Sequence, residues 1–361
     1  MLHKIALSLI PGIGNVLART LIAYVGSVEG IFEEKKQNLI KIPGIGEVLA
    51  QSIANADVFD KAEQELLFIE KNNINTSFYL DKEFPARLKT MHDAPMILYW
   101  KGSAIDLDSK KIISIVGTRK MTNYGRTHCE RLIDELKEHK HEVIIVSGLA
   151  YGVDICAHKA ALKNNLPTIG IVAHGLDTLY PSEHKKTASQ MLENGAIMTE
   201  YTSKTALSPK QFVKRNRIIA GISAATIVIE SASEGGSLLT AQMAADYGRD
   251  VFAFPGRIGD KYSEGCNLLI KAKKSSLIEN VTDLETFLRW EKKEIALQQK
   301  LFTQLTPEEQ ILADILKQGN LFIDEICSQS QMPSHKVLSL LLNMEFAGCV
   351  KSLPGKIFQL V

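Results

Sequence analysis

The 361-residue sequence predicts an α/β protein whose central parallel sheet is flanked by two smaller domains. Three observations indicate this arrangement. A proline- and glycine-containing pentapeptide occurs twice in a helical N-terminal region, apolar runs alternate with amphipathic stretches through the middle, and helical patterns followed by two short β-runs end the chain. The apolar fraction of 45% and the charged fraction of 23% are ordinary for a globular protein, so packed cores are expected.

The N-terminal region, residues 1–75, contains IPGIG at Ile10–Gly14 and again at Ile42–Gly46. Proline fixes φ, glycine permits a tight turn, and apolar residues at helical spacing follow each pentapeptide. A small all-α domain with a pair of helix-hairpin-helix motifs is therefore predicted. Helix N-termini attract phosphate, so these turns can hold a nucleic-acid backbone. The glycines in question are Gly12, Gly14, Gly44 and Gly46. Because few cations follow the turns, a purely structural role is the alternative.

Residues 76–290 are predicted to form an extended Rossmann-like domain. Apolar runs such as KIISIVG, TIGIVAHG and ATIVIES are separated by amphipathic stretches such as GRTHCERLIDELKEHK. Continuous apolar strands with intervening helices indicate a parallel sheet with helices on both faces. Ligands of such sheets bind beyond the carboxyl ends of the strands, so the loops at those ends form the candidate binding site.

Residues 300–361 follow a charged helical stretch and predict a winged helix-turn-helix domain. Three helical patterns precede two short β-runs around Pro354–Gly355, which is a hairpin signal. The predicted recognition helix carries few cations, among them His335 and Lys336. Insertion into the major groove is therefore doubtful, and a protein contact or an idle role is an equal alternative.

Composition narrows the class of function. The formal net charge is +1, so any nucleic-acid site must be a local cationic region. The five cysteines form no C-x-x-C pair, which argues against a zinc site or a disulfide framework and fits a reducing cytoplasm. The N-terminus lacks the core of a signal peptide, and no apolar run reaches membrane-spanning length. We expect a cytoplasmic protein without a cofactor, a metal or a membrane partner.

The predicted strand-end loops carry phosphate-binding features. The first strand ends in a turn with Gly117, Arg119 and Lys120, which can present N–H groups and a guanidinium to a phosphate. The turn Gly235–Ser237 lies at the start of a later predicted helix, and a helix N-terminus can bind phosphate. Neither G-x-x-x-x-G-K-[ST] nor G-x-G-x-x-G is present, so neither ordinary P-loop ATP use nor NAD binding is predicted.

Three further residues near these loops have structural interpretations. Asp154 precedes a helix and is interpreted as its N-cap. Lys185 can face the binding site formed by the strand-end loops, and a position on a solvent-exposed helix face is an equal alternative. His158 is interpreted as a residue packed on its helix, without a catalytic role.

The most informative segment runs from Tyr201 to Ile229 and contains no Asp or Glu. Its cations are Lys204, Lys210, Lys214, Arg215 and Arg217. Phe212 lies among them. Cations interleaved with an aromatic ring suit single-stranded nucleic acid, because the charges hold the backbone and the ring stacks on a base. The two arginines are two positions apart at a helix start, so we expect them to point in different directions.

The segments SIVGTRKMTNYG, SGLAYGVDICAHKAAL, FVKRNRIIAGIS and ESASEGGSLLTAQMAADYGRDVFAFPG occur in an order that resembles the DNA processing protein A (DprA, or Smf) family over about residues 80–275. The resemblance implies a bacterial homodimer that binds and protects single-stranded DNA and loads the RecA recombinase during natural transformation. Combined with the loop features, it gives a candidate single-stranded-DNA site. This site comprises Gly117, Arg119, Lys120, Lys185, Lys210, Phe212, Lys214, Arg215, Asn216, Arg217, Gly235, Gly236 and Ser237.

The alternative is an enzyme of the nucleotide phosphoribohydrolase type, from the lysine decarboxylase-like group, whose parallel-sheet core is similar. Such enzymes carry a catalytic Glu in a P-G-G-x-G-T-x-x-E turn, whereas the corresponding run here, Glu234–Gln242, ends in glutamine. A neutral amide cannot act as a general base or nucleophile. We therefore predict binding rather than catalysis, with no catalytic residue.

Overall fold

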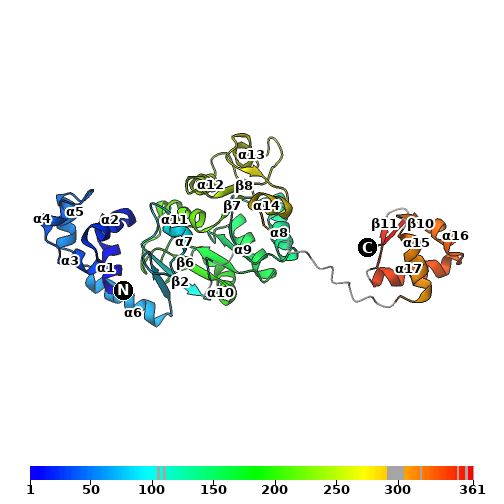
Figure 1. Cartoon of the computed structure of the whole chain (residues 1–361), viewed down its shortest axis with the longest axis horizontal. Helices are drawn as coiled ribbons and strands as arrows, with labels where there is room; N and C mark the ends of the chain where they lie inside the picture. The colour runs from blue at the N-terminus through cyan, green and yellow to red at the C-terminus, as the bar shows by residue number, and fades with distance from the viewer. Residues whose placement is uncertain are drawn as a thin grey trace. The chain divides into compact units, whose positions relative to one another are not determined.

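The computed structural model describes residues 1–103, 106–108, 111–290, 305–317, 319–347, 349–353 and 357–360. The chain forms two compact units, Met1–Lys293 and Glu294–Val361 (Figure 1). The expected turn at Pro354–Gly355, and the part of the charged stretch between residues 291 and 300, lie outside the described residues. Among the described residues, no helix is both long enough and apolar enough to cross a membrane.

A nine-stranded sheet forms the centre of the described part of the first unit, with the order β1-β2-β6-β5-β4-β3-β7-β8-β9. The strands are β1 (Asn75–Phe78), β2 (Ile97–Gly102), β3 (Lys111–Val116), β4 (Val143–Ser147), β5 (Thr168–Ile171), β6 (Ala196–Thr199), β7 (Ala225–Val228), β8 (Asp250–Ala253) and β9 (Ser276–Leu277). The pairs β1–β2 and β2–β6 are antiparallel, and the remaining pairs are parallel. The strand order changes direction between β3 and β7, and such a switch point opens a crevice for ligands.

Helices cover both faces of this sheet, as Figure 1 shows, and alternate residues of β3 face opposite layers. Ile112 and Val116 belong to one buried cluster, and Ile113 and Ile115 belong to the other. The first layer contains α7 (Ala86–Lys89), α11 (Pro209–Ile222), α12 (Gly236–Asp246) and α13 (Glu264–Lys271), and the second contains α8 (Asn123–Glu138), α9 (Val153–Lys163) and α14 (Val281–Leu288). This two-sided burial explains the continuous apolar runs, and it confirms the predicted fold class.

The N-terminal residues form two similar hairpins. The helices are α1 (Leu2–Leu9), α2 (Asn15–Val25), α3 (Val28–Glu33), α4 (Lys36–Leu39), α5 (Glu47–Ala54) and α6 (Phe59–Lys71). Gly12 and Gly44 both have a φ of 83°, which favours glycine. A Cβ atom on Gly12 would lie 2.7 Å from Leu49 Cδ2, and one on Gly44 would lie 3.0 Å from Leu17 Cδ2. Each turn therefore packs against a leucine of the other hairpin, and this reciprocal packing accounts for the repeated pentapeptide.

This helical core continues onto the antiparallel edge of the sheet. Phe78 of β1 and Tyr99 of β2 are buried in the same cluster as the hairpin residues. Asn15, at the start of α2, donates from Nδ2 to Glu200 Oε2 at 2.9 Å and accepts from the Met96 amide at 3.2 Å. Apolar packing and hydrogen bonds together attach the hairpins to the sheet.

The second unit has the expected winged-helix elements. They are α15 (Pro307–Leu316), β10 (Leu321–Phe322), α16 (Ile323–Ser330), α17 (Ser334–Phe346), β11 (Val350–Leu353) and β12 (Ile357–Leu360), with the sheet order β10-β12-β11. In α17, the predicted recognition helix, the Lys336 ammonium lies 2.5 Å from Glu308 Oε1. Leu338, Leu342 and Phe346 are exposed at helical spacing. The exposed side of α17 is therefore more apolar than cationic.

Candidate nucleic-acid interface

A pocket of about 250 Å³ lies at the switch point of the sheet. The loop after β3, the loop after β4, the helix α11 and the start of α12 all contribute to it. Its lining includes Gly117, Thr118, Arg119, Ala150, Asp154, Arg215, Asn216, Gly235, Gly236, Ser237 and Thr240. The fold thus gathers predicted site residues from segments that are more than 100 positions apart, because parallel strands present their carboxyl ends to one edge.

Small residues shape the pocket wall. A Cβ atom on Gly117 would lie 2.8 Å from the Glu230 carbonyl oxygen, and one on Gly235 would lie 2.2 Å from Ser231 Oγ. Gly236 has no atom within 4 Å of its ideal Cβ position. It is the first residue of α12, and the first amides of a helix have no acceptor inside the helix. The start of α12 therefore offers donors to an anion in the pocket.

Arg119 lines the pocket, and Phe212 lies beside Arg119 without being part of the pocket lining. The Arg119 side chain is exposed, and its guanidinium carbon lies 5.7 Å from the centroid of the half-buried Phe212 ring. Tyr180 approaches the same ring edge-on, with centroids 5.7 Å apart and an angle of 64° between the ring planes. One cation and two aromatic rings can serve a phosphate and a nucleobase side by side. The sequence pattern does not indicate this contact, because Tyr180 and Phe212 lie in separate segments of the chain.

Arg215 of α11 is buried, with 4% of the residue exposed, and it lines the pocket. Its Nη1 donates to the Gly148 carbonyl at 2.7 Å and also to the Ile171 carbonyl. Burial lowers the pKa of Arg215 to about 10, and the nearby Asp154 carboxylate opposes that shift. The guanidinium thus ties α11 to the strand ends of β4 and β5.

The N-cap role predicted for Asp154 is wrong. Gly152 is the N-cap residue of α9, and Asp154 lies in the first turn of that helix. Its Oδ2 accepts from the amides of Gly148 at 3.1 Å and Ala150 at 3.4 Å. Burial raises the pKa of Asp154, while Arg215 and these amides act to lower it. The carboxylate does not cap the helix. It accepts hydrogen bonds from the loop after β4 and thereby holds that loop.

Arg217 has a different set of partners. It pairs with Glu200, and its Nη1 donates to the Asp93 carbonyl at 2.7 Å. Glu200 is the same residue that accepts from Asn15 of the first hairpin. The two arginines of α11 therefore point in different directions, as their spacing predicts, and Arg217 connects the sheet to the helical region. Nothing in the sequence pattern indicates this contact, because Asn15 and Glu200 are 185 positions apart.

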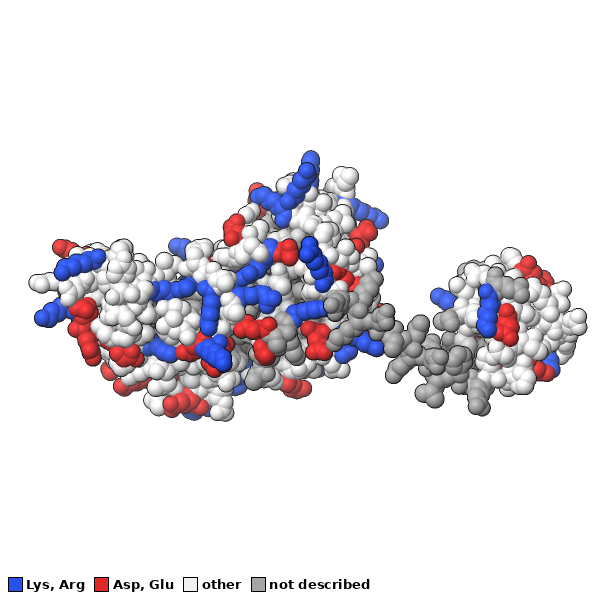
Figure 2. Space-filling model, in the orientation of Figure 1, with Lys and Arg blue, Asp and Glu red and all other residues white. Residues whose placement is uncertain are grey.

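The remaining predicted lysines do not line the pocket. Lys120, Lys185, Lys210 and Lys214 are all exposed. Lys214 Nζ lies 5.9 Å from the Tyr201 ring centroid, and Lys185 begins α10 (Lys185–Asn194). Figure 2 shows a band of Lys and Arg side chains across one face of the first unit. Exposed ammonium groups of this kind suit contacts with a flexible phosphate backbone.

The hairpin glycines divide into two pairs. Gly12 and Gly44 are packed against leucines, whereas Gly14 and Gly46 have no atom within 4 Å of an ideal Cβ and are the N-caps of α2 and α5. Arg19, the nearest cation after the first turn, donates to the Met91 carbonyl at 2.9 Å. Both helix starts are open. The cation that follows the first of them, Arg19, is already hydrogen-bonded within the protein.

Gln242, the residue at the position of the catalytic Glu in the alternative enzyme class, is exposed on α12 and is not part of the pocket lining. Its amide donates to Asp246 Oδ1 at 2.8 Å and accepts from Lys274 Nζ at 3.1 Å. The side chain is engaged on the helix surface, away from the groups that line the pocket.

Three family models match successive parts of the chain. The SAM-like helix-hairpin-helix tandem matches residues 5–56, DNA recombination-mediator protein A matches residues 75–289, and the DprA winged helix domain matches residues 301–356. Among curated relatives, DNA processing protein DprA of Streptococcus pneumoniae is 39% identical over 53% of this chain and 67% of its own length. Protein Smf of Escherichia coli is 32% identical over 81% of this chain and 79% of its own length.

Solved structures agree with these matches. DprA of Streptococcus pneumoniae covers 79% of this chain and 97% of its own, with a TM-score of 0.65 and 30% identity. DNA processing protein A of Helicobacter pylori, whose structure concerns a single-stranded DNA binding mode, covers 60% of this chain and 95% of its own, with a TM-score of 0.54 and 30% identity. The chain therefore belongs to the DprA/Smf family of DNA-processing proteins.

Proposed function

We propose that this protein binds single-stranded DNA at the switch-point pocket, protects it, and delivers it to the RecA recombinase during natural transformation and homologous recombination. The observation that carries the proposal is the Arg119–Phe212 pair beside the start of α12. The exposed guanidinium and the helix start bind phosphate, and the aromatic ring stacks on a base. Family membership and the DNA-binding structure of the Helicobacter pylori relative support it.

The residues of the predicted site divide into two roles under this proposal. Arg119, Phe212 and the Gly235–Ser237 turn contact the DNA. Arg215 and Arg217 are positioning residues, because their guanidiniums are buried and hydrogen-bonded to the protein. Phosphates farther along the DNA strand are held by the exposed lysines Lys120, Lys185, Lys210 and Lys214.

The proposal includes a homodimer and a RecA contact, both of which follow from the family resemblance, and it places the protein in the cytoplasm. It favours binding over nucleotide hydrolysis. Gln242 offers no carboxylate at the position where the enzyme class carries its catalytic Glu, and its amide is engaged with Asp246 and Lys274. Release of free base from nucleoside monophosphates at about 1 s⁻¹ or faster would reverse this choice.

Fluorescence anisotropy with single-stranded and duplex oligonucleotides of equal length tests the proposal. We expect the single strand to bind more tightly, because bases paired in a duplex cannot reach Phe212. Phe212→Ala should reduce this preference, whereas Phe346→Ala removes an exposed ring from the winged-helix unit and serves as the matched control. Equal affinity of the unmodified protein for the two forms of DNA would contradict the stacking role.

A further inference from the structure

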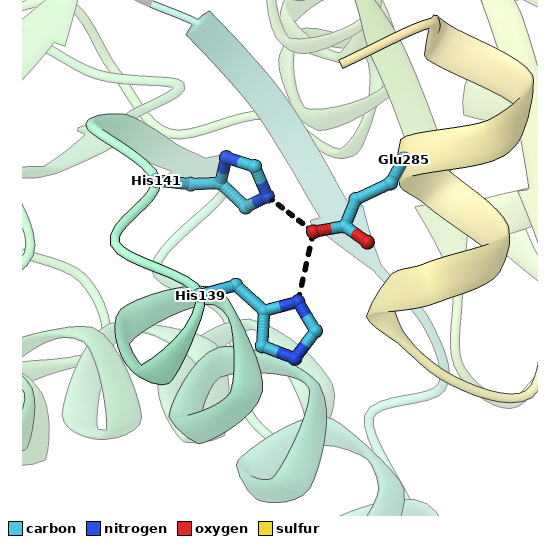
Figure 3. Close-up of side chains that lie close together, drawn as sticks. All are labelled: His139, His141 and Glu285. Atoms are coloured by element: carbon cyan, nitrogen blue, oxygen red, sulfur yellow. Dashed lines mark hydrogen bonds and ion pairs between the residues drawn. The ribbon is translucent and has the colours of Figure 1, made fainter. Parts of the chain in front are cut away.

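Two histidines and a glutamate meet outside the candidate DNA site, where α8 ends and β4 begins (Figure 3). His139 Nδ1 lies 2.8 Å from Glu285 Oε1, and His141 Nε2 lies 2.9 Å from the same oxygen. The three ligand atoms are all within 4.8 Å of one another. The His141 and Glu285 side chains are 1% and 2% exposed, and that of His139 is 30% exposed. The cluster is therefore buried but open to solvent on the His139 side.

The local backbone explains why both rings face one carboxylate. His139 is the C-cap of α8, and Lys140 has a φ of 56°. The His141 amide then donates to the Leu136 carbonyl at 3.1 Å, which closes the turn. This turn places the two histidines, which are two positions apart, on the side where α14 presents Glu285 (Figure 3).

We propose that His139, His141 and Glu285 form a binding site for a divalent transition-metal ion of the zinc class. Two imidazoles and one carboxylate are a common ligand set for Zn²⁺ when a water molecule completes the coordination. Metal–ligand bonds of about 2.1 Å place tetrahedral ligand atoms roughly 3.4 Å apart. The present hydrogen-bonded separations of 2.8 and 2.9 Å require a small outward shift of the two rings. The exposed edge of His139 provides the route for the ion and for its water ligand.

The rings change tautomer when they bind the ion. A carboxylate oxygen only accepts hydrogen bonds, so each ring now directs an N–H at Glu285, and each must carry its proton on the other nitrogen to ligate a metal. For His139 that nitrogen is Nε2. For His141 it is Nδ1, which lies 3.4 Å from Lys111 Nζ. Two donors would then face each other, so Lys111 must withdraw.

Lys111 also lies against an aromatic ring. Its Nζ lies 4.4 Å from the centroid of the Trp290 ring, and that ring lies 5.1 Å from the His141 ring. The ammonium can move toward the aromatic face when the Nδ1 proton appears. Its positive charge opposes the ion in either position. Lys111 therefore weakens metal binding, which is a prediction that a simple histidine–carboxylate hydrogen-bond network would not make.

The ion would fasten α14 to the corner between α8 and β4. None of the three ligands belongs to the switch-point pocket, so the site is independent of the proposed DNA binding. Because the three ligands are brought together only in the folded chain, Zn²⁺ is expected to raise the unfolding temperature.

Titration of the full chain with Co²⁺, followed by displacement with Zn²⁺, tests the proposal. Tetrahedral Co²⁺ reports its ligands through visible absorption bands. The measurement is made with Cys327→Ser and Cys349→Ser, because these two cysteines are partly exposed thiols and would compete. We expect one ion per chain, and affinity at least tenfold lower for His139→Ala and for Glu285→Gln. Lys111→Met should raise the affinity severalfold.

His3→Ala is the matched control, because His3 also lies beside a carboxylate, with Nδ1 4.0 Å from Glu29 Oε1, but has no second histidine. It should leave Co²⁺ binding unchanged. His139 is partly exposed, so its substitution decides the matter if Glu285→Gln unfolds the protein. The proposal is overturned if saturable Co²⁺ binding is absent, or if His139→Ala binds Co²⁺ as tightly as the unmodified chain and shows the same Zn²⁺-dependent rise in unfolding temperature.

Discussion

The switch-point pocket and the N-terminal hairpins both present open glycines at helix starts, yet their surroundings differ. Gly236 at α12 lines the same pocket as the buried Arg215 and as Arg119, whose guanidinium lies beside the Phe212 ring. Gly46 at α5 is followed by an acidic residue, and the cation after Gly14, Arg19, is hydrogen-bonded to a carbonyl of the main domain. A helix start offers only a weak attraction for phosphate. Under the proposed function, the neighbouring charge and aromatic surface decide whether such a helix start binds DNA.

The two regions also use buried charge differently. In the pocket, Arg215 and Asp154 are both buried and hold the loop after β4. The hairpin core is held by apolar residues and by the reciprocal leucine–glycine contacts. The pocket should therefore be sensitive to the removal of a charge, and the hairpins to changes of volume.

The largest expected effect is that of Arg215→Met. The substitution removes the buried positive charge that stabilises the Asp154 carboxylate and the donor to the Gly148 carbonyl, so we expect the free energy of unfolding to fall by about 3–5 kcal/mol. Urea denaturation measures the change. Lys214→Met is the matched control, because it removes an exposed cation from the same helix and should change stability by about 0.5 kcal/mol or less. Equal stability of the two variants would show that the buried Arg215 guanidinium does not hold the loop.

A second prediction concerns acid stability. Burial lowers the pKa of His158 to about 3, and its Nε2 has no hydrogen-bond partner among the described residues. The unfolded chain protonates this ring below about pH 6.5, whereas the folded chain does so only near the lowered value. The stability that the neutral ring provides is intact above about pH 6.5. It is lost as the pH falls from there toward the lowered pKa, at about 1.4 kcal/mol per pH unit.

His158→Gln should therefore flatten the dependence of unfolding free energy on pH between about 6.5 and 4.5. His3→Ala, which replaces a half-exposed hairpin histidine, should leave the dependence unchanged. Denaturant unfolding at a series of pH values provides the measurement. If both variants retain the full slope, another group accounts for the acid sensitivity.

The smallest expected effect comes from a pair of matched glycine substitutions. Neither Gly236 nor Gly46 has an atom within 4 Å of an ideal Cβ, so alanine fits at both positions. Gly236→Ala adds a methyl group to the pocket wall and should lower single-stranded DNA affinity severalfold, whereas Gly46→Ala should change it by less than about twofold. Anisotropy titrations compare them. A larger loss for Gly46→Ala would identify the hairpins as the principal phosphate contact.

The sequence predicts the sheet and much of the pocket, because both depend on local patterns. Continuous apolar runs indicate strands buried on two faces, and strand-end glycines with Arg119 and Phe212 indicate a phosphate and base site. The contacts of Glu200 with Asn15 and of Tyr180 with Phe212 join separate segments and leave no local pattern. The N-cap interpretation of Asp154 is wrong because a carboxylate near a helix start can instead reach back to loop amides.

The His139–His141–Glu285 cluster was equally hidden. The two histidines alone are too common a pair to predict a site, and their shared partner comes from a helix 144 positions beyond His141 in the chain. The usual sequence signal for zinc is the spacing of cysteines, which cannot reveal a site that contains no cysteine.

The dependence of DNA affinity on salt tests the central claim most directly, because it separates phosphate contacts from stacking. Arg119→Ala and Phe212→Ala are titrated with the same single-stranded oligonucleotide at several salt concentrations. We expect Arg119→Ala to reduce the slope of log affinity against log salt by about one unit. Phe212→Ala should cost about 1–3 kcal/mol with almost no change in slope. Unchanged affinity of Phe212→Ala at every salt concentration would contradict the account, because the pocket would then bind DNA through charge alone.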